Sequence, residues 1–313
     1  MSFEAGSQQR AAVVFWMTGF LEYVQFVLAP QMITGLALGV AVVLVALGLT
    51  IIFGLLDVIN MAHGEFYAVG AYLALALGVS GVNFWVLLVI VPLLMLPIGY
   101  VVERALIQRV FNLPDRHVTT LLLTFGLGLV IEEGLKVVFG SQTQRPPTPI
   151  SGAIEVMGVL LPKYRLFLIV IGFVIVAAVA IVVNKTRLGA LVRAAAFDRN
   201  MAASLGVPVS RVFALTFAFG VALAGLAGVL LAPIYSVFPT MGRDFIFLAF
   251  TVVIVGGMGS ITGAVVAGLL ITQVQAISSL IVSPVWSDPI VFSIMVMVLV
   301  VRPQGLFGRL GHG

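Results

Sequence analysis

Met32-Ile-Thr-Gly-Leu-Ala-Leu-Gly-Val-Ala-Val-Val-Leu-Val-Ala-Leu-Gly-Leu-Thr-Ile-Ile-Phe-Gly-Leu55 runs without a single charged residue. An α-helix crosses the hydrocarbon core of a bilayer, roughly 30 Å thick, with about 20 mainly apolar residues. A transmembrane β-strand would instead alternate polar and apolar residues, and this run is unbroken. The segment therefore predicts a membrane-spanning helix.

Runs of the same kind recur along most of the chain. Of its 313 residues, 61% are hydrophobic and 9% are charged, against about 25% charged in an ordinary soluble domain. Backbone polar groups in lipid must be satisfied within the protein, which unbroken apolar runs achieve as helices. We expect an all-α, polytopic bundle of about nine spans, within a range of about eight to ten. These spans are expected near 32–55, 65–81, 84–103, 118–139, 165–183, 212–232, 244–258, 262–282 and 288–302.

The breaks between the runs predict one membrane domain at 32–302, with no separate soluble module. Residues 1–31 are expected to form an interfacial helix or an extra span, and residues 303–313 a short tail. Arg10 precedes an apolar run, but no small-residue cleavage site follows it, so a cleaved signal peptide is not expected. The polar, proline-rich segment at 140–162 cannot continue a helix and is expected to lie outside, over the mouth of a pathway.

Basic residues are distributed unevenly between the two sets of loops. The loops at 103–117 and 184–211 hold, together with the tail, ten lysines and arginines. The opposite loops hold four, which are Arg145, Lys163, Arg165 and Arg243. Because basic residues concentrate in cytoplasmic loops, the first set is expected in the cytoplasm together with the C-terminus.

One segment between the first two spans, Gly54-Leu-Leu-Asp-Val-Ile-Asn-Met-Ala-His-Gly-Glu65, combines polar side chains with glycines. It reads either as an ordinary cytoplasmic loop or as a broken or re-entrant helix. Its hydrophobic character and its glycines favour the second interpretation. Because buried polar groups are costly in lipid, Asn60 and His63 are expected to face the protein interior or an aqueous route, with Gly64 beside them.

A second segment, Thr251-Val-Val-Ile-Val-Gly-Gly-Met-Gly-Ser-Ile-Thr-Gly-Ala264, places small residues between two apolar runs. Helix packing alone explains the pattern well, because Gly259 and Gly263 have the spacing of a helix-packing face. Discontinuous segments can also mark the substrate site of a transporter. Gly257, Gly259 and Ser260 are therefore candidate pathway residues.

A third segment, 186–208, reads as one cytoplasmic helix that Gly206 caps and Pro208 terminates. Leu188, Leu191 and neighbouring apolar residues share a face, which suits a membrane surface, a partner protein or a surface helix with no partner. The chain contains no GxxxxGK[ST] motif, so ATP would have to be bound by another subunit. We expect neither a cofactor nor a metal site in this chain, which has no cysteine.

These segments and the ending Arg302-Pro-Gln-Gly-Leu-Phe-Gly308 closely resemble permease subunits of the branched-chain amino-acid (Liv-type) ABC transporter family. The resemblance covers nearly all of residues 22–308. It is most specific from Ala46-Leu-Gly-Leu-Thr50 through Asp57-Val-Ile-Asn-Met-Ala-His-Gly-Glu65 to Gly70-Ala-Tyr72.

The resemblance implies a multi-pass permease in the inner membrane of a bacterium or archaeon, without enzymatic activity of its own. Its implied partners are a second related permease, two cytoplasmic ATPases and an external solute-binding protein. It also implies that the segment at 186–208 is a coupling loop that docks into an ATPase. The residues expected to take part in that coupling are Arg187, Arg193, Asp198, Met201 and Gly206.

Other functions stay open at this point. An ion-coupled secondary transporter or a channel would normally place ionisable groups in the middle of a span, and the sequence suggests none there. Glu132, Glu133 and Lys136 lie toward the outer end of their span, where their spacings of three and four residues suit pairing. An enzyme is less well supported, because His63 and Glu65 have no nucleophile or metal-ligand pattern beside them; a scaffold leaves the broken helices unexplained. Within the importer interpretation, branched-chain or similar small amino acids are the expected substrates, with urea, short amides or other amino acids as alternatives.

Overall fold

The structure is a computed structural model that describes residues 19, 22–111, 113, 115–156 and 158–308. Within these residues it consists of helices, their connecting loops and one small antiparallel hairpin of strands β1 (Ala153–Val156) and β2 (Val159–Pro162). The long helices are α2 (Ala29–Leu56), α3 (His63–Val79), α4 (Phe84–Val102), α6 (Arg116–Phe139), α7 (Lys163–Lys185), α10 (Val209–Tyr235), α11 (Met241–Gly256), α12 (Ile261–Ile281) and α13 (Ser287–Val301). Short helices are η1 (Val24–Leu28), η2 (Glu103–Ile107), α5 (Gln108–Val110), α8 (Arg187–Phe197), α9 (Arg199–Ser204) and η3 (Pro284–Trp286). The expected all-α class is confirmed.

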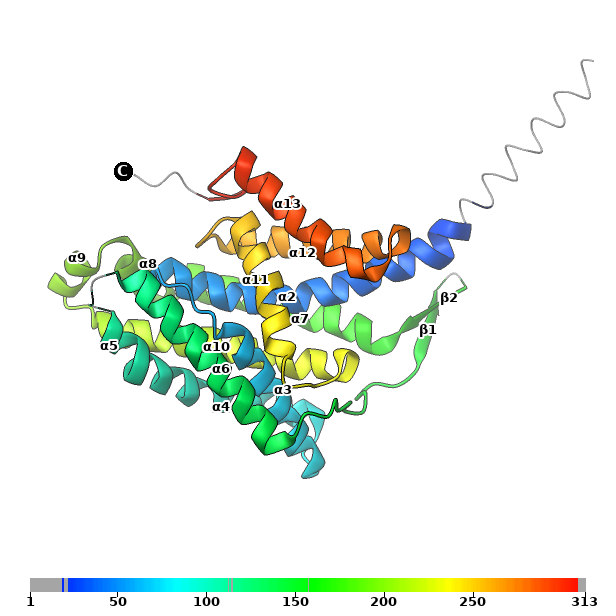
Figure 1. Cartoon of the computed structure of the whole chain (residues 1–313), viewed down its shortest axis with the longest axis horizontal. Coiled ribbons are helices and arrows are strands. Elements are labelled where there is room, and N and C mark those ends of the chain that lie inside the picture. Colours follow the sequence, from blue (N-terminus) through cyan, green and yellow to red (C-terminus); the bar gives the residue numbers. More distant parts are fainter. Residues whose placement is uncertain (1–18, 20–21, 112, 114, 157, 309–313) are drawn as a thin grey trace, which may run out of the picture.

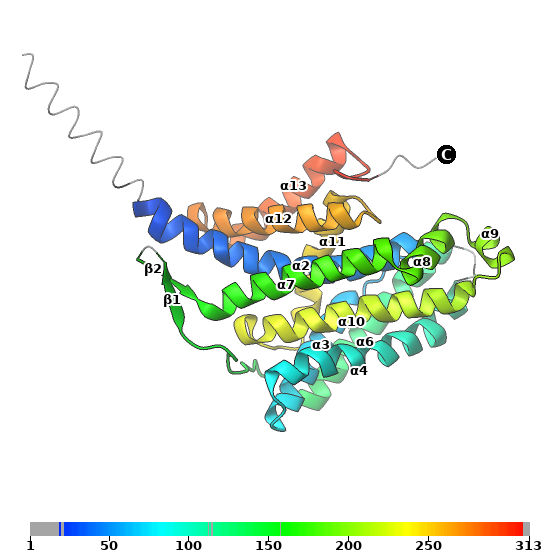
Figure 2. The same cartoon turned by 180° about the vertical axis from the view of Figure 1, so that it is seen from behind.

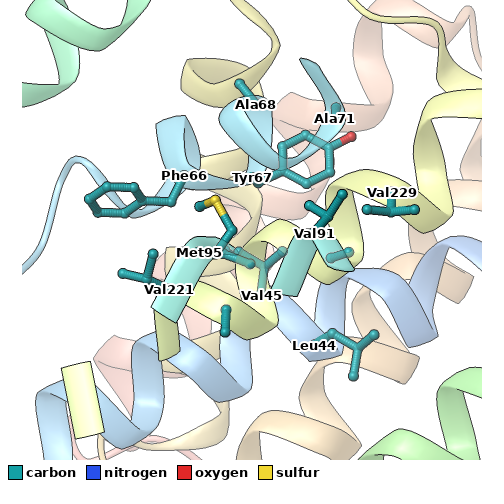
Figure 3. Packing of buried hydrophobic residues seen from close by; sticks show 14 of the residues in the cluster. Leu44, Val45, Phe66, Tyr67, Ala68, Ala71, Val91, Met95, Val221 and Val229 are labelled. Atoms are coloured by element: carbon teal, nitrogen blue, oxygen red, sulfur yellow. The ribbon is translucent and has the colours of Figure 1, made fainter. Parts of the chain in front are cut away.

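Helices α2 and α10 form the centre of the bundle, and the other helices surround them (Figures 1 and 2). Helix α2 packs against α10 and α12, while α10 also packs against α3 and α4. Figure 3 shows part of the resulting core, which includes Leu44 and Val45 of α2, Met95 of α4 and Val221 of α10. The two central helices are buried on nearly all sides, which explains why their sequences are apolar all round rather than amphipathic.

Each of the nine segments expected to span the membrane coincides with a helix. Within the described residues, five helices are long and apolar enough to cross a bilayer: Val24–Leu56, Phe84–Val110, Lys163–Lys185, Val209–Tyr235 and Ile261–Ile281. Helices α3, α11 and α13 are shorter, with 17, 16 and 15 residues. Helix α6 is long but carries the charged side chains of Glu132, Glu133 and Lys136.

The first long helix begins earlier than the boundary expected at residue 32. The π-turn η1 continues directly into α2, so residues 24–31 belong to the same helix as the first span. Residues 1–18 and 20–21, on which most of the expected interfacial helix or extra span falls, lie outside the described residues.

The two ends of the bundle differ in composition. Helices α5, α8 and α9 lie together at one end, and the β1–β2 hairpin lies at the opposite end (Figure 1). The basic loops at 103–117 and 184–211 therefore share one end, as the charge pattern predicts. Helices α4 and α7 expose apolar side chains along their length, including Val89, Leu93, Val170 and Val174. This surface suits contact with lipid.

Candidate functional site

The helical path of the chain is broken between α2 and α3. Helix α2 ends at Leu56, and Asp57 adopts a left-handed conformation with φ 53°. The next residues lead back along α2, so that Nε2 of His63 donates a hydrogen bond to the backbone oxygen of Val45 at 3.1 Å. Val45 lies about 16 Å before the end of α2 at 1.5 Å per residue. Helix α3 therefore begins about halfway along α2, not at the end of the bundle.

Polar contacts hold this re-entrant segment in place. The side-chain oxygen of Asn60 accepts a hydrogen bond from the backbone nitrogen of Ala62 at 3.1 Å. The hydroxyl of Thr124 on α6 accepts another from the backbone nitrogen of Met61 at 3.0 Å. Asn60 and His63 are both fully buried, which confirms that they face the interior rather than lipid. Nδ2 of Asn60 and Nδ1 of His63 have no hydrogen-bond partner among the described residues.

A second break separates α10 from α11. Ser236 follows α10 with φ 65°, and α11 begins at Met241 against the start of α3. The backbones of Gly64 and Gly242 touch, and a Cβ on Gly64 would collide with the backbone oxygen of Gly242. The N-terminal ends of two short helices therefore meet inside the bundle, where their dipoles combine to favour negative charge. In Figure 1, α11 crosses α2 steeply beside α3.

Carboxylates and basic groups gather at this meeting point. Glu65 lies in the first turn of α3 and packs against Gly242, and it is 5% exposed. Glu132 on α6 is 3% exposed and accepts hydrogen bonds from the Arg243 guanidinium at 2.6 and 2.7 Å and from Nζ of Lys136 at 2.8 Å. Glu133 receives a further bond from Lys136 at 2.7 Å, so the pairing expected from the spacing of these residues is present.

The structure thus buries the carboxylates of Glu65 and Glu132 inside the bundle, although the sequence suggests no ionisable group in the middle of a span. The apolar pattern of the sequence places Glu65 at the edge of an expected span and Arg243 in an expected outer loop, because each residue follows a break in that pattern. The breaks lie inside the bundle, since α3 and α11 begin beside the middle of other helices. Glu65 is consequently buried, and Arg243, although about half exposed, reaches the buried carboxylate of Glu132.

The segment 257–260, with glycines at positions 257 and 259, forms a turn rather than a helix-packing face. Gly259 has φ 81° and lies before the start of α12, so the expected pairing of Gly259 with Gly263 on one helix is wrong. Ser260 is the N-cap of α12, and its hydroxyl accepts a hydrogen bond from the backbone nitrogen of Gly263 at 3.1 Å. Gly263 instead packs against Gly256 at the end of α11. Gly257 packs against Gly308, where the C-terminal segment contacts the end of α11.

The candidate pathway residues thus form two groups. Asn60, His63 and Gly64 lie together in the interior, whereas Gly257, Gly259 and Ser260 belong to the turn before α12, where Gly259 lies beside Gly54 near the end of α2. A cavity of about 440 Å³ near that end is lined by residues of α2, α7, α8 and the 258–262 segment. Its lining residues include Gly54, Gly259, Ser260 and Arg193. Two of the sequence motifs and the expected coupling loop therefore meet at one cavity.

The segment at 186–208, which is expected to form the coupling loop, consists of two helices instead of the single expected one. Helix α8 ends at Phe197, and Asp198 adopts an extended conformation and caps α9 by accepting a hydrogen bond from the backbone nitrogen of Met201 at 2.9 Å. An aspartate at this position stabilises a new helix start better than a continuing helix, which explains the division. Gly206, with φ 81°, ends α9 as expected.

The two helices have different surroundings. Ala195 of α8 is fully buried, and Leu188, Leu191 and Val192 line an apolar cavity of about 270 Å³ against α2, α4, α7 and α10. The apolar face of α8 is therefore directed towards its own bundle. At the tip, in contrast, Phe197, Met201 and Leu205 are 89%, 58% and 79% exposed. Arg187 begins α8, and the guanidinium of Arg193 donates to the backbone oxygen of Val183 at the end of α7.

Arg199, which the sequence analysis did not single out, connects the coupling loop to the re-entrant segment. Its guanidinium donates to the backbone oxygen of Leu56 at 3.0 Å and lies 4.5 Å from the ring centre of Phe111 and 5.0 Å from that of Phe213. Partial burial and the nearby Arg116 lower the pKa of Arg199, but arginine stays protonated at neutral pH. Arg116 in turn binds the carboxylate of Asp57 at 2.9 Å. No local pattern signals these contacts, because the partners are far apart in sequence.

Comparison with known proteins adds independent information. Residues 31–301 match the protein family described as "Branched-chain amino acid transport system / permease component". The chain is 32% identical over 294 residues to the high-affinity branched-chain amino acid transport system permease protein LivH of Salmonella typhimurium, covering 89% of this chain and 95% of that protein.

Two further relatives have similar descriptions. The permease protein BraD of Pseudomonas aeruginosa, named for the same kind of transport system, is 30% identical over 300 residues, covering 89% of this chain and 95% of the relative. The permease protein LivM of Escherichia coli is 25% identical over 288 residues, covering 84% of this chain and 67% of the relative. No solved structure matches the chain.

Proposed function

Because the chain belongs to the family of permease components of branched-chain amino acid transport systems, we propose that it is the membrane subunit of an ATP-binding-cassette importer. It lies as a multi-pass protein in the inner membrane of a bacterium or archaeon. It moves branched-chain or similar small amino acids inward, and separate ATPase subunits supply the energy. The substrate is supported by the names of its relatives rather than by any side chain, so urea, short amides and other amino acids stay as alternatives.

The observation that carries this function is the bond between Arg199 and Leu56. An importer needs a mechanical connection between the subunit that hydrolyses ATP and the segment that opens the pathway. Arg199 belongs to the loop that would meet the ATPase, and Leu56 is the last residue before the re-entrant segment. A displacement of the loop would therefore act on the position of Asn60 and His63.

The exposed tip of the coupling loop is the proposed docking surface for an ATPase. Phe197, Met201 and Leu205 are spaced by four residues and expose apolar side chains at the end of the bundle. Exposed apolar residues grouped in this way mark contact surfaces. Arg187, Arg193, Asp198 and Gly206 shape the loop and connect it to α7, and we assign them this supporting role in coupling.

The re-entrant segment is the proposed gate. Asn60, His63 and Gly64 occupy its buried part, whereas Gly259 and Ser260 border the cavity of about 440 Å³ at the end where the coupling loop lies, and Gly257 precedes them in the same turn. The basic loops support a cytoplasmic location for this end and for the C-terminus. Substrate would pass the gate before it reaches that cavity.

The proposed assembly contains a second related permease, two ATPases and an external solute-binding protein. Similarity to both LivH and LivM supports two different permeases in one transporter. The test of the ATPase requirement is direct. The purified chain should hydrolyse no ATP and transport nothing until both ATPases are added, whereas hydrolysis by the chain alone would contradict the proposal.

The substrate needs a separate test. Binding should be measured on the solute-binding protein encoded beside this permease, since that subunit commonly sets the specificity of such importers. We expect tight binding of leucine, isoleucine or valine. Tight binding of urea or an amide, without amino-acid binding, would change the assigned substrate and leave the importer interpretation intact.

One observation favours a second candidate, an ion-coupled transporter. Buried ionisable groups inside a membrane domain often bind a coupling ion or proton, and Glu65 lies beside the Glu132–Arg243 pair in the interior. Transport by that mechanism would depend on an ion gradient rather than on ATP. Collapse of the gradient separates the two candidates.

A further inference from the structure

A cavity of about 330 Å³ lies in the half of the bundle opposite the coupling loop, between α3, α11, α12 and α13. Its wall combines aromatic rings with polar groups, among them Tyr67, Asp244, Phe245, Phe247, Gln275 and Asp288. Its volume is at the small end of the range for ligand pockets, about 300–1,000 Å³. None of these residues belongs to the re-entrant segment or to the cavity beside the coupling loop.

The aromatic part of the wall is rigid. The rings of Tyr67 and Phe245 are stacked, with centroids 4.3 Å apart and an angle of 17° between their planes. Tyr67 is 1% exposed, and Figure 3 shows its ring packed among core residues. Its hydroxyl makes no hydrogen bond to another described residue, although its ring borders the cavity. A buried hydroxyl without a partner is available to a bound molecule.

The polar part of the wall is negatively charged. Asp244 and Asp288 both line the cavity, and its lining residues include no lysine or arginine. The amide nitrogen of Gln275 donates to the carboxylate of Asp288 at 2.9 Å, and its oxygen has no partner among the described residues. The guanidinium next to Asp244, that of Arg243, is already bound to Glu132. The two carboxylates therefore retain most of their capacity to accept hydrogen bonds.

We infer that this cavity binds an organic ammonium group attached to an apolar side chain. Asp244, Asp288 and the Gln275 oxygen accept hydrogen bonds from the ammonium group, while the faces of the aromatic rings contact both the cation and the apolar part. An amino acid with an apolar side chain has this combination of groups. The inference deepens the proposed function, on which it rests: the cavity is the site that receives the amino acid on its way to the gate.

The test uses the absence of cysteine from the chain. Phe247 is 49% exposed at the cavity, so a Phe247→Cys variant of the assembled transporter offers one accessible thiol there. Its labelling rate is measured with two thiosulfonate reagents of equal size, one bearing an ammonium group and one a sulfonate. A Val79→Cys variant, at an 82% exposed position on α3 away from the cavity, is the matched control.

We expect the cationic reagent to label Phe247→Cys at least about tenfold faster relative to the control, because acidic clefts concentrate cations. Asp244→Asn together with Asp288→Asn should abolish that preference. Leucine and its decarboxylated amine should protect the thiol, and N-acetylleucine should not. Equal rates for both reagents, or labelling that leucine leaves unchanged, would overturn the inference. If the same complex still takes up leucine with ATP, the proposed function stands without this site.

Discussion

Arg199 donates a hydrogen bond from its guanidinium to the backbone oxygen of Leu56 at 3.0 Å and joins the coupling loop to the last residue of α2. The last carbonyls of a helix lack partners within the helix and carry partial negative charge. A cation at this place therefore stabilises the helix end. The Phe111 and Phe213 rings hold the guanidinium in position.

We expect Arg199→Ala to reduce transport by about tenfold or more, because a hydrogen bond to a charged group contributes roughly 1.5–3 kcal/mol. ATP hydrolysis by the assembled transporter should fall less than leucine uptake, since the connection between loop and gate is lost while the ATPases remain intact. Both rates are measured in the same vesicles. Arg211→Ala, at an exposed arginine whose side chain forms no hydrogen bond or ion pair with another described residue, is the control and should leave both rates unchanged. Equal losses of uptake and hydrolysis would contradict the coupling role.

A second prediction concerns the gate. Asn60→Leu leaves the buried backbone nitrogen of Ala62 without its acceptor, at a cost of about 1–3 kcal/mol. Leucine uptake should decrease, while the complex with the ATPases still assembles and can be purified. Full transport by an Asn60→Leu, His63→Leu double variant would show that this segment is an ordinary connection.

The contact between α3 and α11 is tested through two glycines. Gly64→Ala should destabilise the protein markedly, because the added methyl group would collide with the backbone oxygen of Gly242. Gly126 of α6 has no heavy atom near its Cβ position, so Gly126→Ala should instead stabilise the helix by about 0.5–1 kcal/mol. The thermal unfolding midpoints of both variants, compared with that of the unchanged protein, test this contact. Equal effects of the two substitutions would mean that the helix starts do not touch.

The ion pair between Arg243 and the buried Glu132 allows a thermodynamic cycle. Arg243→Gln leaves the buried carboxylate of Glu132 paired with Lys136 alone. Because one partner is kept, the loss of stability should reach roughly 2–3 kcal/mol, less than when a buried charge loses its only partner. Combining it with Glu132→Gln should recover part of that loss, since no unpaired charge then stays buried. Unfolding of the two single variants and the double variant measures the coupling energy. Strictly additive losses would argue against a direct interaction.

Local patterns in the sequence predict the local features of this fold. The apolar run at 32–55 predicts the core of α2, the spacing of Glu132, Glu133 and Lys136 predicts their pairing, and Gly206 marks the end of α9. Each of these features depends on residues within a few positions of one another.

The features that connect distant segments could not be predicted in this way. The Arg199–Leu56 bond joins residues 143 positions apart, and the Arg243–Glu132 pair joins residues 111 positions apart. The depth of Glu65 depends on where the break between α2 and α3 lies in the bundle, which hydropathy cannot specify. The polar breaks identified the right segments, but their contacts follow from the packing of the whole bundle.

ATP-driven uptake is the most direct test of the central claim, that this chain conducts amino acids under the control of separate ATPases. The chain is reconstituted in vesicles with the second permease, both ATPases and the solute-binding protein, and uptake of labelled leucine is measured after ionophores have collapsed all ion gradients. We predict uptake that requires ATP and is unchanged by the ionophores. Uptake that stops when the gradients collapse, or that proceeds without ATP, would contradict the account and favour ion coupling through the buried carboxylates.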